Sequence, residues 1–174
     1  MKLFGLAGWS GSGKTTLVVR LLPELIGRGI SVSTVKHAHH SFDIDQPGKD
    51  SFEHRRAGAR EVLVTATHRW ALLHENRGED EPSLESLLAH LSPVDLVLIE
   101  GFKALPHPKL EVHRPAVGKA LLCDGDPRIV AVASDTPLPR VRLPVLDLDD
   151  ASAIADFIVG HCGLDRTTAR ACEA

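Results

Sequence analysis

The chain has 174 residues, 43% of them apolar and 25% charged, so it is long enough to bury a core and is most simply interpreted as one domain. Lysine and arginine number 20 against 23 aspartates and glutamates, and the net charge of −3 argues against binding nucleic acid over the whole surface. The longest apolar runs fall far short of the roughly 20 residues that cross a bilayer. We therefore expect neither DNA or RNA nor a membrane as a partner.

The start of the chain and its cysteines indicate the compartment. Residues 1–5 lead directly into a glycine-rich segment, with neither a long apolar stretch nor a small-residue cleavage site. Cys123, Cys162 and Cys172 form no CxxC pair and are odd in number, so we expect reduced thiols rather than a disulfide framework or a zinc ribbon. These features predict a cytoplasmic protein.

Apolar periodicity alternates between strands and helices along most of the chain. The expected strands are residues 2–9, 30–35, 95–99, 109–113, 120–123, 129–133 and 145–148, and the expected helices are residues 17–26, 49–58, 84–91 and 151–159. Such alternation favours an α/β fold with a mostly parallel sheet flanked by helices and covered on both faces. Residues 61–67 and 69–74 differ, because two β-rich runs separated by a short polar break predict a β-hairpin.

The glycine-rich segment after the first expected strand matches the phosphate-loop pattern G-x-x-x-x-G-K-[ST] in full, as Gly8-Trp9-Ser10-Gly11-Ser12-Gly13-Lys14-Thr15. Its glycines let successive backbone N–H groups point at phosphate oxygens, and the start of a helix adds positive partial charge there. Lys14 bridges the outer phosphates, Thr15 offers a hydroxyl to Mg²⁺, and Thr16 reaches the α-phosphate. The alternative is a glycine-rich turn with a solvated lysine. We predict a P-loop NTPase domain over residues 1–160, followed by a tail over residues 161–174.

Two acidic residues at strand ends extend this hypothesis. Glu100 follows the buried strand 95–99, where a second acidic group is expected near the metal; the alternative is a carboxylate that caps the following turn. Asp135 follows the strand 129–133 and has the acceptors that the N1–H and exocyclic amine of guanine require. Asp135 as a turn residue before Pro137 is nearly as well supported.

A polar segment after the second expected strand is rich in histidines and acids: His37, His39, His40, Asp43, Asp45 and Asp50. Imidazoles and carboxylates at this density are compatible with a zinc site. A switch-like loop whose acids position water or Mg²⁺, and a polar loop without chemistry, are the alternatives.

With these residues considered, the chain closely resembles the molybdopterin-guanine dinucleotide biosynthesis protein B family over about residues 1–160. The segments that carry the resemblance are Trp9–Thr16, Lys36–His40, Asp43–Ser51, Arg69–Leu72 and Glu100–Lys103. The first segment is shared by many ATPases and GTPases, whereas the combination is far more specific. The family comprises P-loop proteins that bind GTP with Mg²⁺, hydrolyse it slowly, form homodimers and assist the molybdenum cofactor guanylyltransferase, which joins GMP to molybdopterin.

The resemblance implies roles for individual residues. The loop residues Gly11, Ser12, Gly13, Lys14, Thr15 and Thr16 hold the phosphates, and Glu100 joins Thr15 in the metal shell directly or through water. Asp45 and Asp50 lie near the γ-phosphate. The hairpin around residues 69–72 is the dimer element, whose strands extend the sheet of the partner subunit, although a buried core position for Trp70 is an equal alternative.

The sequence thus predicts a dimeric, Mg²⁺-dependent GTP-binding protein with weak GTPase activity that acts as an adaptor in attaching GMP to molybdopterin, with molybdopterin as a further candidate ligand. Water attacks the γ-phosphate, and positioning and charge stabilisation supply most of the catalysis. Arg55, Arg56 and Arg60 are candidates for an arginine that reaches the site. A P-loop small-molecule kinase and a non-catalytic, nucleotide-dependent adaptor are the alternative functions.

Overall fold

The computed structural model describes residues 1–38, 42–102 and 105–165, and the chain divides into two compact units. Met1–His37 and Pro93–Ala174 form the first, here called the sheet unit. Ala38–Ser92 form the second, the hairpin unit. The two units differ in how much of their apolar surface they bury.

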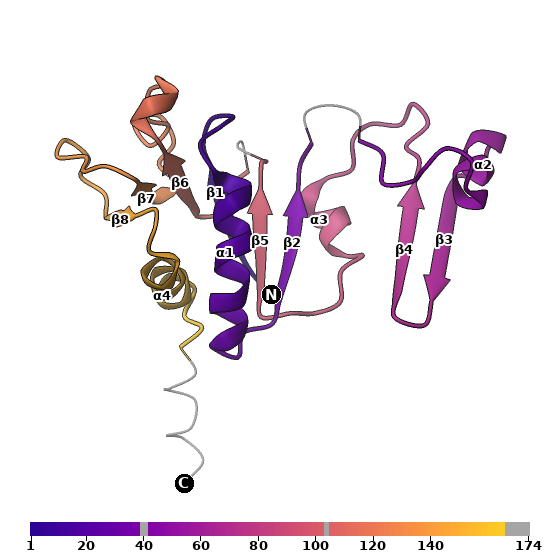
Figure 1. Cartoon of the computed structure of the whole chain (residues 1–174), viewed down its shortest axis with the longest axis horizontal. Helices are drawn as coiled ribbons and strands as arrows, with labels where there is room; N and C mark the ends of the chain where they lie inside the picture. The colour runs from indigo at the N-terminus through magenta and orange to yellow at the C-terminus, as the bar shows by residue number, and fades with distance from the viewer. Residues whose placement is uncertain (39–41, 103–104, 166–174) are drawn as a thin grey trace, which may run out of the picture. The chain divides into compact units, whose positions relative to one another are not determined.

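The sheet unit is built on six parallel strands in the order β2-β5-β1-β6-β7-β8 (Figure 1). Its elements are β1 (Lys2–Ala7), α1 (Lys14–Gly27), β2 (Val32–Lys36), β5 (Leu96–Glu100), β6 (Lys109–His113), the 3-10 turn η1 (Pro115–Val117), β7 (Ile129–Ser134), β8 (Val145–Asp147) and α4 (Ala151–Cys162). The connection after β1 leads toward the edge of the sheet that β2 forms, whereas the connection after β5 leads back past β1 to β6, toward the opposite edge. The strand order therefore reverses between β1 and β6. In open parallel sheets, ligands bind at the carboxyl ends of the strands at such a point. The predicted α/β class and the parallel sheet are confirmed.

One face of the sheet is covered by α1 and α4, which also pack against each other (Figure 1). Alternate strand residues such as Phe4, Leu98 and Leu110 point into this core, as the two-residue period of a strand requires. On α1 the buried residues Leu17, Leu21 and Leu25 are spaced by four, so they line one helix face. The helix continues through Pro23 and ends at Gly27.

The second face of the sheet carries buried charged residues from β6. Lys109, Glu111 and His113 are all less than 9% exposed, although they alternate with apolar residues that face the helices. The Glu111 carboxylate accepts hydrogen bonds from the backbone N–H groups of Leu122 (2.8 Å) and Cys123 (2.9 Å). The strand predicted at residues 120–123 is therefore wrong: these amides bond to a buried side chain, and the segment forms a bend and turn.

His107 lies under β1 in the same layer. A Cβ atom on Gly5 would come within 2.5 Å of Nε2 of His107, so the ring occupies space that glycine leaves open. His107 is 7% exposed, and neither ring nitrogen has a hydrogen-bond partner among the described residues. Burial, together with the positive charges of Lys109 and Arg128, lowers the pKa of His107 to about 4. The ring is therefore neutral at physiological pH.

The hairpin unit contains α2 (Asp50–Ala57), β3 (Glu61–Ala66), β4 (Arg69–His74) and α3 (Leu84–Leu88). The two strands form the predicted antiparallel hairpin, with Leu63 opposite Leu72 and Thr65 opposite Trp70. Trp70 is 64% exposed, so the buried-core alternative for this residue is wrong. The predicted helix over 84–91 is shorter than expected and ends at Leu88.

The structure also bears on the predictions for the final helix, the cysteines and a membrane crossing. The final helix is longer than expected and ends at Cys162, beyond residue 160, where the predicted domain meets the predicted tail. Cys123 and Cys162 are free thiols, and burial, followed by the charge of Glu111, raises the pKa of Cys123 to about 11; Cys172 lies outside the described residues. None of the helices in the described ranges has the length and apolarity that a membrane crossing requires.

Candidate nucleotide-binding site

The phosphate-loop pattern lies between the carboxyl end of β1 and the start of α1, as predicted. Gly8 has a φ of 146°, and a Cβ atom there would meet the carbonyl oxygen of Val112 at 2.5 Å, so this position requires glycine. Gly13, with a φ of 98°, is the N-cap of α1 and provides no side-chain cap. The first turn of α1 also lacks acidic residues. The first N–H groups of a helix have no intrahelical partner, and here no capping side chain takes their place, which favours an anion.

The side chains of Lys14 and Ser12 both lie within the phosphate loop but differ in their hydrogen bonds. The Lys14 ammonium donates to the carbonyl oxygens of Gly8 and Trp9, both at 3.0 Å. Ser12 is 2% exposed, and its hydroxyl has no hydrogen-bond partner in the described structure. A buried hydroxyl without a partner is costly, which is consistent with a loop shaped to receive a polar ligand.

Thr15 and Glu100, the two predicted metal ligands, are in direct contact. Oγ1 of Thr15 lies 3.0 Å and 3.2 Å from the two carboxylate oxygens of Glu100. The ammonium of Lys36 lies 3.8 Å from Glu100 Oε2 and 3.5 Å from Thr15 Oγ1. Hard oxygen donors beside a position that already attracts a cation fit Mg²⁺, which prefers oxygen ligands. These residues can therefore hold the ion.

Lys36 is a site residue that sequence reasoning did not identify, except as part of the family resemblance. It is the last residue of β2, and the parallel register pairs it with Glu100, the last residue of β5. Paired residues on neighbouring strands project from the same face of a sheet, so the register brings the ammonium to the carboxylate. A lysine at a strand end carries no such signal unless the register is known.

The backbone after Glu100 adopts a conformation that requires glycine at position 101. Gly101 has a φ of 101°, and a Cβ atom there would lie 2.7 Å from Cβ of His37, so the chain after β5 passes closely under the chain after β2. His37 packs its ring on Phe102 at 4.8 Å. His39, His40 and Lys103 lie outside the described residues. Within the described part of the chain, no three His, Cys, Asp or Glu side chains are grouped to hold a metal such as zinc.

Asp135, the predicted guanine acceptor, is paired with an arginine. Nη1 of Arg114 donates to Asp135 Oδ2 at 2.7 Å, and the two side chains are 35% and 24% exposed. Arg114 follows β6 and Asp135 follows β7, so both lie at the carboxyl ends of strands, as the phosphate loop does. Sequence reasoning did not identify Arg114.

The connection between β6 and β7 contacts the phosphate loop at further points. Nε1 of Trp9 donates to the carbonyl oxygen of Ala120 at 2.8 Å, and the Lys119 ammonium lies 5.7 Å from the centre of a Trp9 ring. A Cβ atom on Gly13 would lie 3.5 Å from Nε of Arg114. The buried Glu111 anchors this connection through residues 122 and 123, so the contacts are fixed from within the core.

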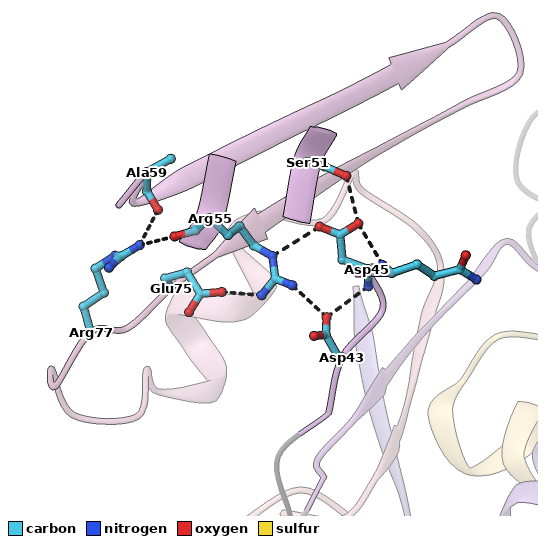
Figure 2. Close-up of polar contacts among 8 residues, drawn as sticks. Asp43, Asp45, Ser51, Arg55, Ala59, Glu75 and Arg77 are labelled. Carbon is cyan, nitrogen blue, oxygen red and sulfur yellow. Dashed lines mark hydrogen bonds and ion pairs between the residues drawn. The ribbon is translucent and has the colours of Figure 1, made fainter. Parts of the chain in front are cut away.

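Asp45 and Asp50, the predicted catalytic acids, belong to the hairpin unit. The Asp45 carboxylate accepts hydrogen bonds from Ser51 at 2.8 Å and from Arg55 at 3.3 Å, and these contacts are drawn in Figure 2. Burial alone raises the pKa of Asp45, but the hydrogen bonds from Ser51, Arg55 and the N–H of Gln46 outweigh it and lower the pKa below its ordinary value. Asp50 is the exposed first residue of α2.

The arginines predicted to reach the site also lie in the hairpin unit. The Arg55 guanidinium contacts Glu75 (2.7 Å), Asp43 (2.8 Å) and Asp45 (3.3 Å), and its bond to Glu75 is the largest cause of its raised pKa (Figure 2). Arg60 pairs with Glu79 at 2.7 Å. These two guanidinium groups are neutralised by carboxylates of their own unit.

The strand order, the all-parallel sheet and the phosphate loop between β1 and α1 define a P-loop NTPase fold. Within that class, the sequence model for "Molybdopterin guanine dinucleotide synthesis protein B" matches residues 3–135. The chain belongs to this family.

Relatives of the chain agree with this assignment. The molybdopterin-guanine dinucleotide biosynthesis adapter protein of Escherichia coli (strain K12) is 43% identical over 162 residues, covering 90% of this chain and 91% of the relative. The adapter protein of the same name from Haemophilus influenzae is 42% identical over 158 residues, covering 90% and 86%. A crystal structure of molybdopterin-guanine biosynthesis protein B superposes with a TM-score of 0.72 at 27% identity, covering 92% of this chain and 99% of the other.

Proposed function

We propose that this protein binds GTP with Mg²⁺ in the phosphate loop, hydrolyses it slowly, and acts as an adapter in the attachment of GMP to molybdopterin. The observation on which the proposal depends is the contact between Thr15 and Glu100, beside a glycine-rich loop that leads into a helix, α1, without a side-chain cap. The names of the relatives supply the pathway. The partners we propose are the molybdenum cofactor guanylyltransferase and, as a second ligand, molybdopterin, in the cytoplasm.

Each residue of the loop has a proposed role. Gly11, Ser12, Gly13 and Thr16 donate hydrogen bonds to phosphate oxygens, and Lys14 turns from its loop carbonyls to the outer phosphates. Thr15 and Glu100 would hold Mg²⁺, which would neutralise phosphate charge when bound. Because the Lys36 ammonium already contacts both residues, it would give up this position to the ion and would add positive charge beside the phosphates.

Hydrolysis itself is proposed to be slow. A water molecule bonds to the γ-phosphorus while the bond to the bridging oxygen of GDP breaks, and charge stabilisation sets the rate. The carboxylates of Asp45 and Asp50 are assigned to this step by the family resemblance. The neutralisation of Arg55 and Arg60 by carboxylates of their own unit supports a low basal rate, since neither is available as a transition-state cation.

We also propose a homodimer formed through the hairpin. Leu63, Leu72 and Trp70 occupy one face of β3 and β4, because they belong to cross-strand pairs two residues apart. Their exposed fractions are 62%, 40% and 64%. A two-stranded hairpin that leaves such a face exposed is only marginally stable, which supports burial against a second copy.

Calorimetric titration with GTP and ATP analogues, with and without Mg²⁺, tests the nucleotide proposal. We expect Mg²⁺-dependent binding of one GTP analogue per subunit and loss of binding in Lys14→Ala. Lys2→Ala, which removes a lysine at the opposite end of β1, is the matched control and keeps wild-type affinity. Preference for ATP would favour a small-molecule kinase, and unchanged affinity in Lys14→Ala would overturn the site.

A further inference from the structure

Two charged residues, Arg114 and Asp135, lie on the side of the phosphate loop away from Glu100. In the sheet order β2-β5-β1-β6-β7-β8, Glu100 ends β5 on one side of β1, and Arg114 and Asp135 follow β6 and β7 on the other. Arg114 bonds to Asp135 at 2.7 Å, and its Nε lies 3.5 Å from the position of a Cβ atom on Gly13. One guanidinium group therefore joins the phosphate loop to the end of β7.

The order of the groups along a nucleotide determines which part of it would lie beside Arg114. The Thr15–Glu100 pair, which would hold Mg²⁺ beside the outer phosphates, lies on the β5 side of the loop. The α-phosphate, ribose and base would then extend toward β6 and β7. The strand order also reverses between β1 and β6, and in open parallel sheets ligands bind at the carboxyl ends of the strands at such a point, which is where Arg114 follows β6.

Asp135 keeps hydrogen-bonding capacity while it is paired. An ionised carboxylate has about four acceptor positions. Arg114 uses Oδ2, and no described residue donates to Oδ1. A carboxylate held on one oxygen by a guanidinium has a fixed orientation, and its second oxygen keeps its acceptor positions for a ligand.

We propose that Arg114 is the positioning residue for base selection: by binding Asp135 Oδ2 and covering Gly13, it holds the Asp135 carboxylate toward a guanine base. This inference rests on the proposed GTP site. Guanine offers N1–H and a 2-amino group, both donors, to the carboxylate. Adenine offers an unprotonated N1, and xanthine has a carbonyl at position 2, so each presents an acceptor to the same carboxylate.

The test is calorimetric titration of the full chain with GTP, XTP, ATP and inorganic tripolyphosphate, each with Mg²⁺, in wild type, Arg114→Ala, Arg114→Lys and Asp135→Asn. We expect Arg114→Ala to lose about tenfold or more in GTP affinity relative to ATP, with tripolyphosphate affinity unchanged. Arg114→Lys, which keeps the charge, recovers part of the loss. Asp135→Asn reverses the preference from GTP to XTP, because its amide N–H₂ donates to the 2-carbonyl of xanthine.

Arg142→Ala is the matched control, since Arg142 is an exposed arginine in the connection before β8, and it keeps the wild-type GTP/ATP ratio. Wild type that binds neither GTP nor tripolyphosphate refutes the proposed function itself. Wild type that prefers GTP, with ratios unchanged in Arg114→Ala and no gain of XTP binding in Asp135→Asn, refutes this inference alone. Equal loss of tripolyphosphate and GTP in Arg114→Ala also refutes it, because Arg114 then binds phosphate.

Discussion

The sheet unit and the hairpin unit use similar strand-forming residues with different outcomes. In β5 of the sheet unit, Leu96–Ile99 are fully buried, because neighbouring strands pair with both edges and both faces are covered. In the hairpin unit, Leu63 and Trp70 are more than 60% exposed. Two strands cannot bury both of their faces, whereas six strands with helices can. Apolar sequence therefore builds a core in one region and an exposed apolar face in the other.

The charged residues of the two units differ in the same way. In the sheet unit, Thr15, Glu100 and Lys36 converge from three elements at the carboxyl edge of the strands. In the hairpin unit, Arg55 is satisfied by carboxylates of that unit and braces the loop before α2 against the end of β4 (Figure 2). The first arrangement brings oxygen donors and a cation together at one edge of the sheet, and the second stabilises a fold.

The largest expected contrast comes from matched truncations in the two units. Phe4→Ala removes a fully buried ring from the sheet core and is expected to lower the free energy of unfolding by about 3–5 kcal/mol. Leu63→Ala, on the exposed hairpin face, is expected to cost less than about 0.5 kcal/mol at concentrations where the protein is monomeric. Urea unfolding measures both. Equal losses would show that the hairpin face is buried in the free chain.

Acid should weaken the sheet unit through His107. The folded protein holds this ring with a pKa of about 4, whereas an unfolded histidine has its ordinary pKa near 6.5. The unfolded state therefore binds a proton first, so stability is complete above about pH 6.5 and falls as the pH drops toward 4, by on the order of 3 kcal/mol. His107→Leu should flatten this part of the stability profile, and the exposed control His68→Leu should not. A slope that survives in His107→Leu would assign the effect to another group.

The helix caps offer a smaller contrast. Asp150 caps α4 by accepting from the N–H of Ala153 at 2.9 Å, and Ser83 caps α3 by accepting from the N–H of Ser86 at 3.2 Å. Asp150→Ala should cost about 1 kcal/mol of global stability, because α4 packs on the sheet. Ser83→Ala should mainly increase hydrogen exchange within the short helix α3. The reverse pattern would mean that the hairpin unit limits global unfolding.

The smallest expected effect on folding comes from Trp70→Ser, within about 0.5 kcal/mol, because the side chain is 64% exposed. The same change should weaken self-association at least about tenfold by sedimentation, since aromatic residues dominate interfaces. Arg69→Ser, its neighbour on the other face of the hairpin, is the control. A dimer unaffected by Trp70→Ser would place the interface elsewhere.

Local signals in the sequence were sufficient for much of the fold. The phosphate loop was predicted correctly because its glycines and the following helix lie within a few residues of one another. Glu100 was predicted from the end of an apolar strand, and the hairpin from two β-rich runs. The positions of Lys36 and Arg114 beside the loop were missed because they depend on which strands become neighbours. The strand expected at residues 120–123 failed because a distant carboxylate, Glu111, takes its amides.

The sequence by itself determined the loop, its helix and the alternation that makes a parallel sheet, because these depend on spacing along the chain. Only the tertiary structure decided which side chains surround the loop. The parallel register brought Lys36 to Glu100, and the order of β1, β6 and β7 brought Arg114 between Gly13 and Asp135. These contacts join residues 21, 64 and 101 positions apart. They are set by strand order and register, which depend on how the whole core packs rather than on any single segment.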